Sequence, residues 1–518
     1  MPFMTFNDML RRTAMRVPEK TFLYWTDKGR SLTYAQGEQV SDQVAGALAA
    51  LGVDKGDRVG IFAHNGLDYV MAMFGAWKLG AISAHVSVLQ AENLAYFVND
   101  AEPKVFIYTG DMHPVIERNR ANMPSVQHYI CYDGAKDGSH DWSTLLHSAP
   151  LPPAVDVSDQ DPAHLSYTSG SSGKPKGAVL PHGVVARATN CIAERLGLSS
   201  ADISLGPTSL ASSYHLVANL LPGIHRGVTI GMMSKWNPET AWEEMDQRGV
   251  TVFVSNPLLL TDILNTSRKK SRKPKALRIG VSGGAPVPVE LKRAYQDELG
   301  VILVESYGQS ELGGFVALGH PRRETGAHLE AIGSALPDKE VRIADENGNE
   351  VAVGQPGEMI LRGGYMWGYW RMPEKTAETL RGDWLHTGDM GRMDSEGYIY
   401  MLGRWSERIV SKGQVIFPRP MEEALLRHPA VRYVAVIGRP DSAAGEIPKA
   451  IVALYDGKTA TPEELLQHTR AELGDQPTPE SVEIIPEMPM TPTGKIAKND
   501  LKQREIESMR AGVTVPAN

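Results

Sequence analysis

Short apolar runs alternate with amphipathic helical patterns through most of this 518-residue sequence. Residues 58–63 and 277–282 have the length and composition of strands, and helical patterns follow them at residues 69–79 and 289–299. Strand–helix alternation of this kind is typical of layered α/β domains with partly parallel sheets. Fifty glycines and 34 prolines add many turns and argue against coiled coils and helical repeats.

The pattern changes along the chain, which predicts further units. Between residues 341 and 400 the strands become short and turn-separated, as expected for a β-rich subdomain. The last part combines strands expected at residues 433–437 and 450–455 with helices expected at residues 421–428, 462–473 and 498–509, in a compact α+β unit of a size that can fold by itself. We therefore expect an N-terminal domain of stacked α/β layers over residues 1–404 and a small, mobile C-terminal domain over residues 405–518.

Charge and cysteine content exclude several classes of protein. Lys and Arg number 53 against 61 Asp and Glu, and the net charge of −8 argues against a nucleic-acid binder or a basic membrane-surface protein. Two cysteines exclude a disulfide framework and a cysteine-based zinc cluster. The N-terminus lacks the apolar core of a signal peptide, and Lys78 interrupts the most apolar stretch, residues 69–88. These features predict a cytoplasmic protein without a transmembrane segment.

A loop rich in glycines, hydroxyls and lysines follows a strand that ends near Thr168. Glycine lets backbone N–H groups turn toward an anion, the hydroxyls add donors, and Lys174 and Lys176 add positive charge. This chemistry predicts a polyphosphate site rather than a flexible linker. The loop is not a Walker A motif, because Thr168 and Pro175 stand where that motif requires glycine and serine or threonine, and this excludes a generic P-loop kinase.

Residues 168–177 resemble the signature of the adenylate-forming superfamily, which includes acyl-CoA synthetases, adenylation domains of peptide synthetases and beetle luciferases. Several later segments resemble the same family in the expected order, so the resemblance spans residues 5 to 505 or so. The phosphate-binding residues that it implies are Thr168, Ser169, Gly170, Ser171, Ser172, Gly173 and Lys176.

Residues 306–311 resemble the family motif that ends in a glutamate. The resemblance implies that Glu311 holds Mg²⁺ on the ATP phosphates, a task that suits a carboxylate. It also implies that the ring of Tyr307 packs against adenine. Residues 281–286 would present backbone to the adenine and to the acyl group. The other nucleotide-site residues implied here are Gly283, Gly284, Ala285, Ser306, Gly308, Gln309 and Ser310.

Two further motifs lie near the expected domain boundary. Asp389 matches the family aspartate that binds the ribose hydroxyls, which a carboxylate can accept in pairs, and Arg404 would contact ribose or phosphate. The sequence departs from the family at Ser406, where the hinge residue is usually aspartate or lysine, and at Pro420, where glutamate is common. These departures affect the energetics of the hinge rather than the identity of the domain.

Lys495 matches the catalytic lysine of the family's last motif, where its charge would stabilise the carboxylate and α-phosphate oxygens. His215 lies where the family has a histidine or an aromatic residue near the carboxylate. It is therefore either a catalytic residue or a packed structural one. The basic run at residues 268–275 reads as a solvated loop, with a contact to a phosphate of coenzyme A as the alternative.

The resemblance implies a reaction in two halves. A carboxylate attacks the α-phosphate of MgATP to give an acyl-adenylate and pyrophosphate, and a thiol, that of coenzyme A, then expels AMP. The C-terminal domain would reorient between the halves, so that Lys495 serves the first and the turn at Lys412 and Gly413 helps to form the pantetheine tunnel in the second. A homodimer is left open.

The acyl pocket lacks the aspartate that amino-acid-activating relatives use, since residues 210–223 contain no acid. A plain carboxylic acid is therefore expected, and the many glycines suggest room for a bulky or aromatic one. Three alternatives remain: transfer to a carrier-protein thiol, a luciferase-like activity, and a non-catalytic nucleotide- or acyl-binding protein. The predicted pocket residues are Ser213, Tyr214, His215, Gly283, Gly284, Gly308, Gly313, Gly314 and Phe315.

Overall fold

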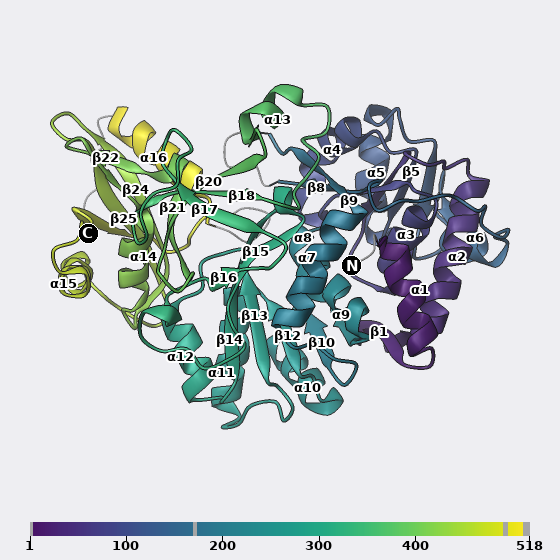
Figure 1. Ribbon diagram of the computed structural model, residues 1–518, viewed down its shortest axis with the longest axis horizontal. Helices are drawn as coiled ribbons and strands as arrows, with labels where there is room; N and C mark the ends of the chain where they lie inside the picture. The colour runs from purple at the N-terminus through teal and green to yellow at the C-terminus, as the bar shows by residue number, and fades with distance from the viewer. Residues whose placement is uncertain (1–3, 169–173, 491–495, 511–518) are drawn as a thin grey trace.

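The computed structural model describes residues 4–168, 174–490 and 496–510. A large N-terminal domain of mixed sheets and helices occupies most of the molecule, and a small C-terminal domain lies at one end (Figure 1). This architecture confirms the fold class predicted from the alternation of strands and helices. In the part of the chain that is described, none of the helices is both long and apolar enough to cross a membrane.

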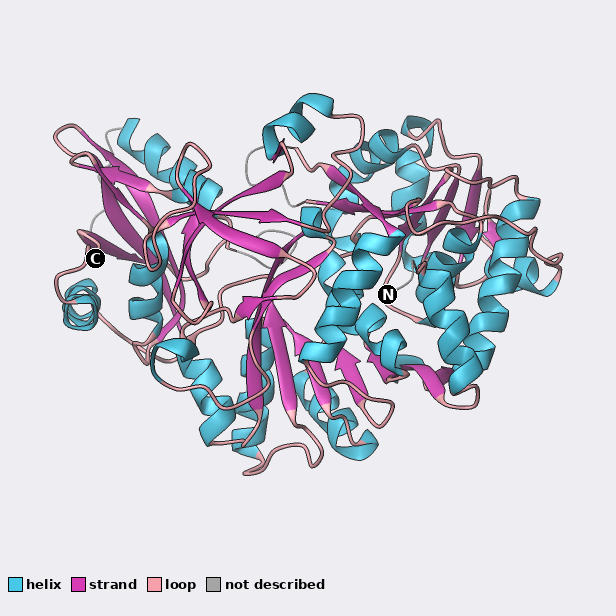
Figure 2. Cartoon of the chain, in the orientation of Figure 1, coloured by secondary structure: helices cyan, strands magenta, loops and turns pink. Residues whose placement is uncertain are grey.

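Among the described residues, the largest sheet has nine strands, and its central strands are parallel (Figure 2). The antiparallel strands lie toward its two edges, where β15 and β2 turn back on their neighbours. In spatial order the strands are β16 (Ser334–Ala335), β15 (Gly314–Leu318), β14 (Ile302–Gln309), β13 (Ile279–Gly283), β12 (Val252–Ser255), β10 (Ile203–Gly206), β11 (Thr229–Met232), β1 (Thr21–Trp25) and β2 (Arg30–Thr33).

The second sheet of the N-terminal domain has seven strands within the described chain. Its last pair, β8 and β9, is antiparallel, so the predicted phosphate loop connects the two strands of a hairpin. In spatial order the strands are β7 (His140–Asp141), β6 (His128–Cys131), β5 (Val105–Tyr108), β3 (Arg58–Phe62), β4 (Ile82–His85), β8 (Pro162–Tyr167) and β9 (Gly177–Pro181).

Helices pack on both sheets, and one continuous apolar core joins the two layers. Trp77 is fully buried in this core, and its indole N–H donates to the backbone oxygen of Ala163, 2.7 Å away. The helices of this domain are α1 (Phe6–Arg16), α2 (Tyr34–Ala50), α3 (Leu67–Lys78), α4 (Leu94–Ala101), α5 (His113–Asn119), α6 (Trp142–His147), α7 (His182–Arg195), α8 (Ser213–His215), α9 (Leu221–Arg226), α10 (Pro238–Arg248), α11 (Pro257–Lys269), α12 (Val289–Asp297) and α13 (Pro373–Thr379).

Two smaller sheets complete the molecule. The first contains β17 (Glu340–Ala344), β18 (Gly357–Arg362), β20 (Trp384–Met393), β19 (Leu380–Arg381) and β21 (Ile399–Arg404), and it forms the predicted β-rich subdomain. The C-terminal sheet contains β23 (Gln414–Ile416), β22 (Ile409–Ser411), β25 (Gly445–Leu454), β24 (Val431–Asp441) and β26 (Ser481–Ile484), and its helices are α14 (Pro418–Leu426), α15 (Pro462–Leu473) and α16 (Lys498–Arg510).

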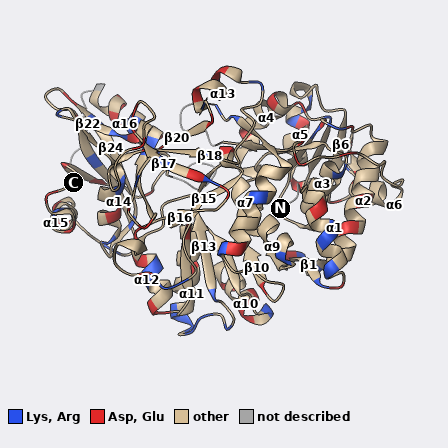
Figure 3. Ribbon diagram, viewed as in Figure 1, with Lys and Arg blue, Asp and Glu red and all other residues tan. Residues whose placement is uncertain are grey.

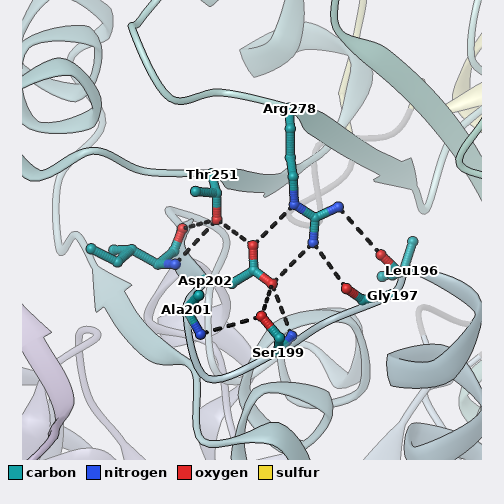
Figure 4. A network of polar contacts seen from close by, with 8 residues as sticks. Leu196, Gly197, Ser199, Ala201, Asp202, Thr251 and Arg278 are labelled. Carbon is teal, nitrogen blue, oxygen red and sulfur yellow. Dashed lines mark hydrogen bonds and ion pairs between the residues drawn. The ribbon is translucent and has the colours of Figure 1, made fainter.

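A polar network ties together the amino ends of three central strands of the nine-stranded sheet (Figure 4). Asp202, just before β10, accepts from both the Nε and the Nη2 of Arg278, each 3.0 Å away, and from the hydroxyl of Thr251 at 2.7 Å. Arg278 precedes β13 and Thr251 precedes β12, so one buried carboxylate fixes the relative position of all three strands. The opposite, carboxyl edge of the sheet carries the predicted site.

Candidate active site

Two hydrogen bonds join the residues at the two ends of the predicted phosphate loop, Thr168 and Lys176. The N–H of Thr168 donates to the oxygen of Lys176 at 2.9 Å, and the N–H of Lys176 donates to the hydroxyl oxygen of Thr168 at 3.3 Å. Next to them, Tyr167 pairs with Gly177 across the hairpin. Ser169, Gly170, Ser171, Ser172 and Gly173 lie outside the described residues.

Glu311 lies in a short 3₁₀ turn, η6 (Ser310–Leu312), directly after β14. Its Oε1 accepts a hydrogen bond of 2.6 Å from the hydroxyl of Tyr369, and its backbone oxygen accepts from the N–H of Met366 at 2.7 Å. The ammonium of Lys176 lies 4.4 Å from the centre of the same tyrosine ring. The predicted metal ligand and a predicted phosphate ligand therefore meet at one side chain, although they come from different sheets.

A second cluster converges on Asp389, which is only 4% exposed. Its Oδ2 accepts from the hydroxyl of Tyr307 at 2.7 Å and from Nε2 of Gln309 at 2.6 Å, while Nε of Arg404 lies 3.3 Å from Oδ1. Burial and the charge of Asp389 hold the pKa of Tyr307 well above its usual value. Burial by itself lowers the pKa of Arg404, but the charges of Asp389 and Glu407 more than reverse this effect.

The turn that carries Asp389 is supported by residues to which the sequence analysis gave no role. Glu358 on β18 accepts from the backbone N–H of Gly388 at 2.9 Å, and its other oxygen lies 2.8 Å from Nδ1 of His386. Glu358 precedes Asp389 by about thirty positions in the chain and follows no catalytic motif, so spacing offered no signal for it. Antiparallel pairing of β18 with β20 brings the two together.

The acyl-pocket candidates surround the carboxyl ends of β13 and β14. Tyr214 donates through its hydroxyl to the backbone oxygens of Ser255 and Val281, both at 3.2 Å, and its ring centre lies 5.8 Å from that of Phe315. Ser213 begins the short helix α8 beside it. Two aromatic rings thus form one wall at this end of the sheet.

The expectation that the glycines leave room for a substrate is wrong for most of them. A Cβ on Gly283 would lie 2.2 Å from the hydroxyl of Ser306, and a Cβ on Gly308 would lie 2.5 Å from the backbone oxygen of Gly314. Side chains of α7 fill the corresponding space at Gly313 and Gly314. Close packing against neighbouring parts of the protein therefore requires these glycines. Among the pocket glycines, only Gly284 faces open space within the described structure.

His215 is fully buried just before a π-helical turn, η5 (Leu216–Leu220). Its Nδ1 lies 2.8 Å from the backbone oxygen of Thr208, and its Nε2 lies 3.3 Å from the amide nitrogen of Asn219. Burial lowers the pKa of His215 to about 4. The imidazole is therefore neutral at pH 7, donates to Thr208 and accepts from Asn219, and holds the segment that precedes Tyr214.

Acidic partners neutralise most of the basic run at residues 268–275. Arg268 pairs with Glu298, Arg272 and Lys275 pair with Asp246, and Lys270 pairs with Glu239 and Glu243. Acidic and basic residues are also interspersed along the rest of the ribbon (Figure 3). This arrangement favours the solvated-loop interpretation over a contact to coenzyme A.

The C-terminal residues of interest are placed as follows. Lys412 and Gly413 form the exposed two-residue turn between β22 and β23, with φ of 51° and 77°. Ser406 is exposed in η8 (Trp405–Glu407), and Pro420 lies in the first turn of α14. Lys495 lies outside the described residues.

The acidic turn after β14, the pair of the buried Asp389 with Arg404 and the small terminal domain together are the arrangement of an enzyme that activates carboxylic acids with ATP. The chain belongs to the family of AMP-binding enzymes, whose model matches residues 10–370, and a model of the AMP-binding enzyme C-terminal domain matches residues 420–495. The resemblance noted from the motifs is thereby confirmed.

Known relatives cover nearly the whole chain. A feruloyl-CoA synthase of Amycolatopsis sp is 33% identical over 92% of this chain and 94% of its own, and an indoleacetate–CoA ligase of Aromatoleum aromaticum is 30% identical over 96% and 98%. Among solved structures, the anthranilate CoA ligase AuaEII in complex with anthranoyl-AMP superposes with a TM-score of 0.92 at 26% identity, over 98% of this chain and 99% of that one. The chain is an acid–thiol ligase that converts a carboxylic acid and ATP into an acyl-adenylate and then into an acyl-CoA.

Proposed function

We propose that the acid is aromatic, and the aromatic wall of Tyr214 and Phe315 is the observation that carries this proposal. The two backbone hydrogen bonds of the Tyr214 hydroxyl fix its ring in place, and Gly283 allows that ring to approach β13. Fixed aromatic rings favour flat aromatic partners through offset and edge-to-face contacts. The ferulate, indoleacetate and anthranilate ligases among the relatives agree with this choice.

The nucleotide would lie across the two clusters described above. Oδ2 of Asp389 already accepts from Tyr307 and Gln309, so a ribose hydroxyl would approach Oδ1, beside Arg404. The hairpin loop after Thr168 and the ammonium of Lys176 would hold the phosphates. The half-buried carboxylate of Glu311, next to that loop, fits a hard cation, and Mg²⁺ bound there would neutralise charge on the phosphate oxygens.

The chain itself supplies no nucleophile in this proposal. Because the substrate carboxylate attacks the α-phosphate, the protein contributes orientation and fixed positive charge at the oxygens where negative charge develops. Lys495, assigned from its motif, would provide that charge in the first half-reaction. A domain boundary near residue 405 would then let the C-terminal domain reorient and bring the exposed turn at Lys412 and Gly413 to the thiol path. The reaction would take place in the cytoplasm.

Pyrophosphate release across a panel of acids tests the substrate. Benzoate, ferulate, anthranilate and indoleacetate would be compared with hexanoate and dodecanoate, with and without coenzyme A, and the thioester identified by mass spectrometry. We expect the aromatic acids to give the higher kcat/KM. Preference for the alkanoates would refute the aromatic assignment, and release without a thioester would indicate a carrier-protein acceptor.

Separate assays of the two half-reactions test the role of Lys495. Lys495→Ala should slow acyl-adenylate formation by about 10²-fold or more, the scale of losing one electrostatic partner of a transition state. Conversion of supplied acyl-adenylate into acyl-CoA should change far less. Equal losses in both halves would contradict the assigned role.

A further inference from the structure

Tyr369 lies between the two charged groups that would handle the ATP phosphates. We propose that Tyr369 is a positioning residue, which orients Glu311 toward the metal and keeps Lys176 apart from it before the nucleotide binds. The inference rests on the proposed roles of Glu311 and Lys176. The sequence analysis gave no role to Tyr369, which follows Glu311 by 58 positions.

The contacts of the Tyr369 side chain carry this inference. Its hydroxyl donates to Oε1 of Glu311 at 2.6 Å, the short distance expected when a hydroxyl donates to a charged carboxylate. Its ring lies 4.4 Å from the ammonium of Lys176, within the range of a cation–π contact. Only 7% of the residue is exposed, so both contacts are shielded from water.

The two contacts have different consequences. With Oε1 occupied by the tyrosine hydroxyl, Oε2 is the oxygen of Glu311 that remains to face a cation. Lys176 rests on the ring instead of the carboxylate, and within the described chain these two residues form no ion pair with each other. A direct pair would have to break before MgATP could bind, so the intervening tyrosine keeps the site ready for its ligand.

The backbone fixes Tyr369 at this point. Residues 367–370 run along β9, the edge strand of the seven-stranded sheet, where Val179 donates to Gly368 at 2.9 Å and Trp370 donates to Gly177 at 2.7 Å. The N–H of Tyr369 donates to the hydroxyl of Thr376 at 2.9 Å. The tyrosine is thus registered against the strand that leaves the phosphate loop, while the N–H of Met366 reaches the backbone of Glu311.

Calorimetric binding of MgATP and of AMP without metal tests the inference. Tyr369→Phe removes the hydroxyl and keeps the ring, so the Kd of MgATP should rise about tenfold, the scale of one hydrogen bond to a charged group. The Mg²⁺ concentration that gives half-maximal ATP binding should rise as well. The Kd of AMP should stay within about twofold, because AMP does not need Glu311.

Tyr365→Phe is the matched control. Tyr365 lies on the same loop, but its hydroxyl is exposed and donates to the backbone oxygen of Asp383 at 3.1 Å. This variant should therefore bind MgATP and AMP like the wild type. An unchanged Kd and Mg²⁺ dependence for Tyr369→Phe would overturn the inference, and so would an equal loss of AMP binding.

Glu311→Gln separates this inference from the proposed function. If Glu311→Gln loses MgATP binding and Tyr369→Phe does not, the positioning role fails and the metal site stands. If Glu311→Gln binds MgATP like the wild type, the metal site itself is refuted, and the positioning role with it.

Discussion

Asp389 is the carboxylate on which Tyr307, Gln309 and Arg404 converge. Asp389→Asn keeps the shape of the side chain, removes the charge that faces Arg404, and leaves the tyrosine and glutamine donors with a weaker acceptor. Hydrogen bonds to charged groups contribute about 1.5–3 kcal/mol, so the KM of ATP should rise about 10- to 100-fold.

Steady-state pyrophosphate release at varied ATP checks this effect. Asp383→Asn, on the exposed turn between β19 and β20, is the control and should leave the KM of ATP unchanged. If Asp389→Asn has the ATP KM and kcat of the wild type, Asp389 does not belong to the nucleotide site.

His215 makes stability depend on pH in a defined direction. The unfolded chain protonates this histidine near pH 6.5, whereas the folded chain does so only near pH 4. Folding stability therefore falls as the pH drops through this interval, by about 3 kcal/mol for the full shift. Urea unfolding at pH 7 and pH 5 should show a smaller loss in His215→Asn than in the wild type. Replacing the exposed His147 should leave the loss of stability as large as in the wild type. If the replacements of His147 and His215 change this loss equally, His215 is not its source.

At the scale of elements, the sequence predicted the helix and strand ends that neighbouring residues determine. Helix α15 (Pro462–Leu473) begins and ends as the sequence predicts, because Thr461 and Glu464 form a capping box and proline follows the cap. Strands β24 (Val431–Asp441) and β25 (Gly445–Leu454) extend beyond the predicted residues 433–437 and 450–455. The residues where the two strands join, 439–441 and 445–446, are mostly polar and at least partly exposed, so no apolar pattern marked them.

The same distinction between local and long-range signals applies to the residues of the candidate site. Motifs singled out Glu311 and Asp389, since each motif is a continuous segment of the sequence. Tyr369 and Glu358 contact residues far from them in the sequence, Glu311 and Gly388, and only the folded chain brings these partners together. The pocket glycines show the converse, because their spacing suggested empty space where the fold packs strands and helices closely.

The network around Asp202 is an element-scale device, since it holds three parallel strands at their amino ends (Figure 4). Burial alone would raise the pKa of Asp202, but hydrogen bonds from Arg278 and Thr251 lower it overall. Asp202→Asn should reduce the free energy of unfolding by about 1–3 kcal/mol. The charged carboxylate contributes its full stabilisation above pH 4 and loses it as the pH falls through its lowered pKa. The loss of unfolding free energy in Asp202→Asn should therefore be equal at pH 7 and pH 5.

Urea unfolding at those two pH values measures the deficit. Asp246→Asn provides a comparison, because Asp246 also pairs with an arginine, but that arginine, Arg272, is 49% exposed. Exposed pairs contribute about 0–1 kcal/mol. A deficit for Asp202→Asn no larger than that of Asp246→Asn would contradict a central role for the network.

At the scale of the whole molecule, a buried ion cluster joins the two domains. Arg419 on α14 reaches Glu305 on β14 at 3.4 Å, and Glu305 also lies 2.6 Å from Nζ of Lys292. All three side chains are less than a tenth exposed. Because β14 carries Glu305 and, two residues later, Tyr307, the strand that anchors the C-terminal domain also forms part of the proposed nucleotide site.

Arg419→Met should therefore weaken this arrangement of the domains more than the N-terminal domain itself. Removing one partner of a buried pair costs about 3–5 kcal/mol, and Lys292, which still neutralises Glu305, should keep the loss nearer the lower end. If the domains reorient between the half-reactions, only one half-reaction takes place in this arrangement. The rate of that half-reaction should fall and the rate of the other should stay the same, so the ratio of the two rates measures the effect.

Arg427→Met is the control, because Arg427 pairs with Glu330 across the same interface at 3.5 Å but is 28% exposed and better screened by water. Equal changes in both half-reactions, or effects of the same size for Arg419→Met and Arg427→Met, would show that the buried cluster does not select this arrangement.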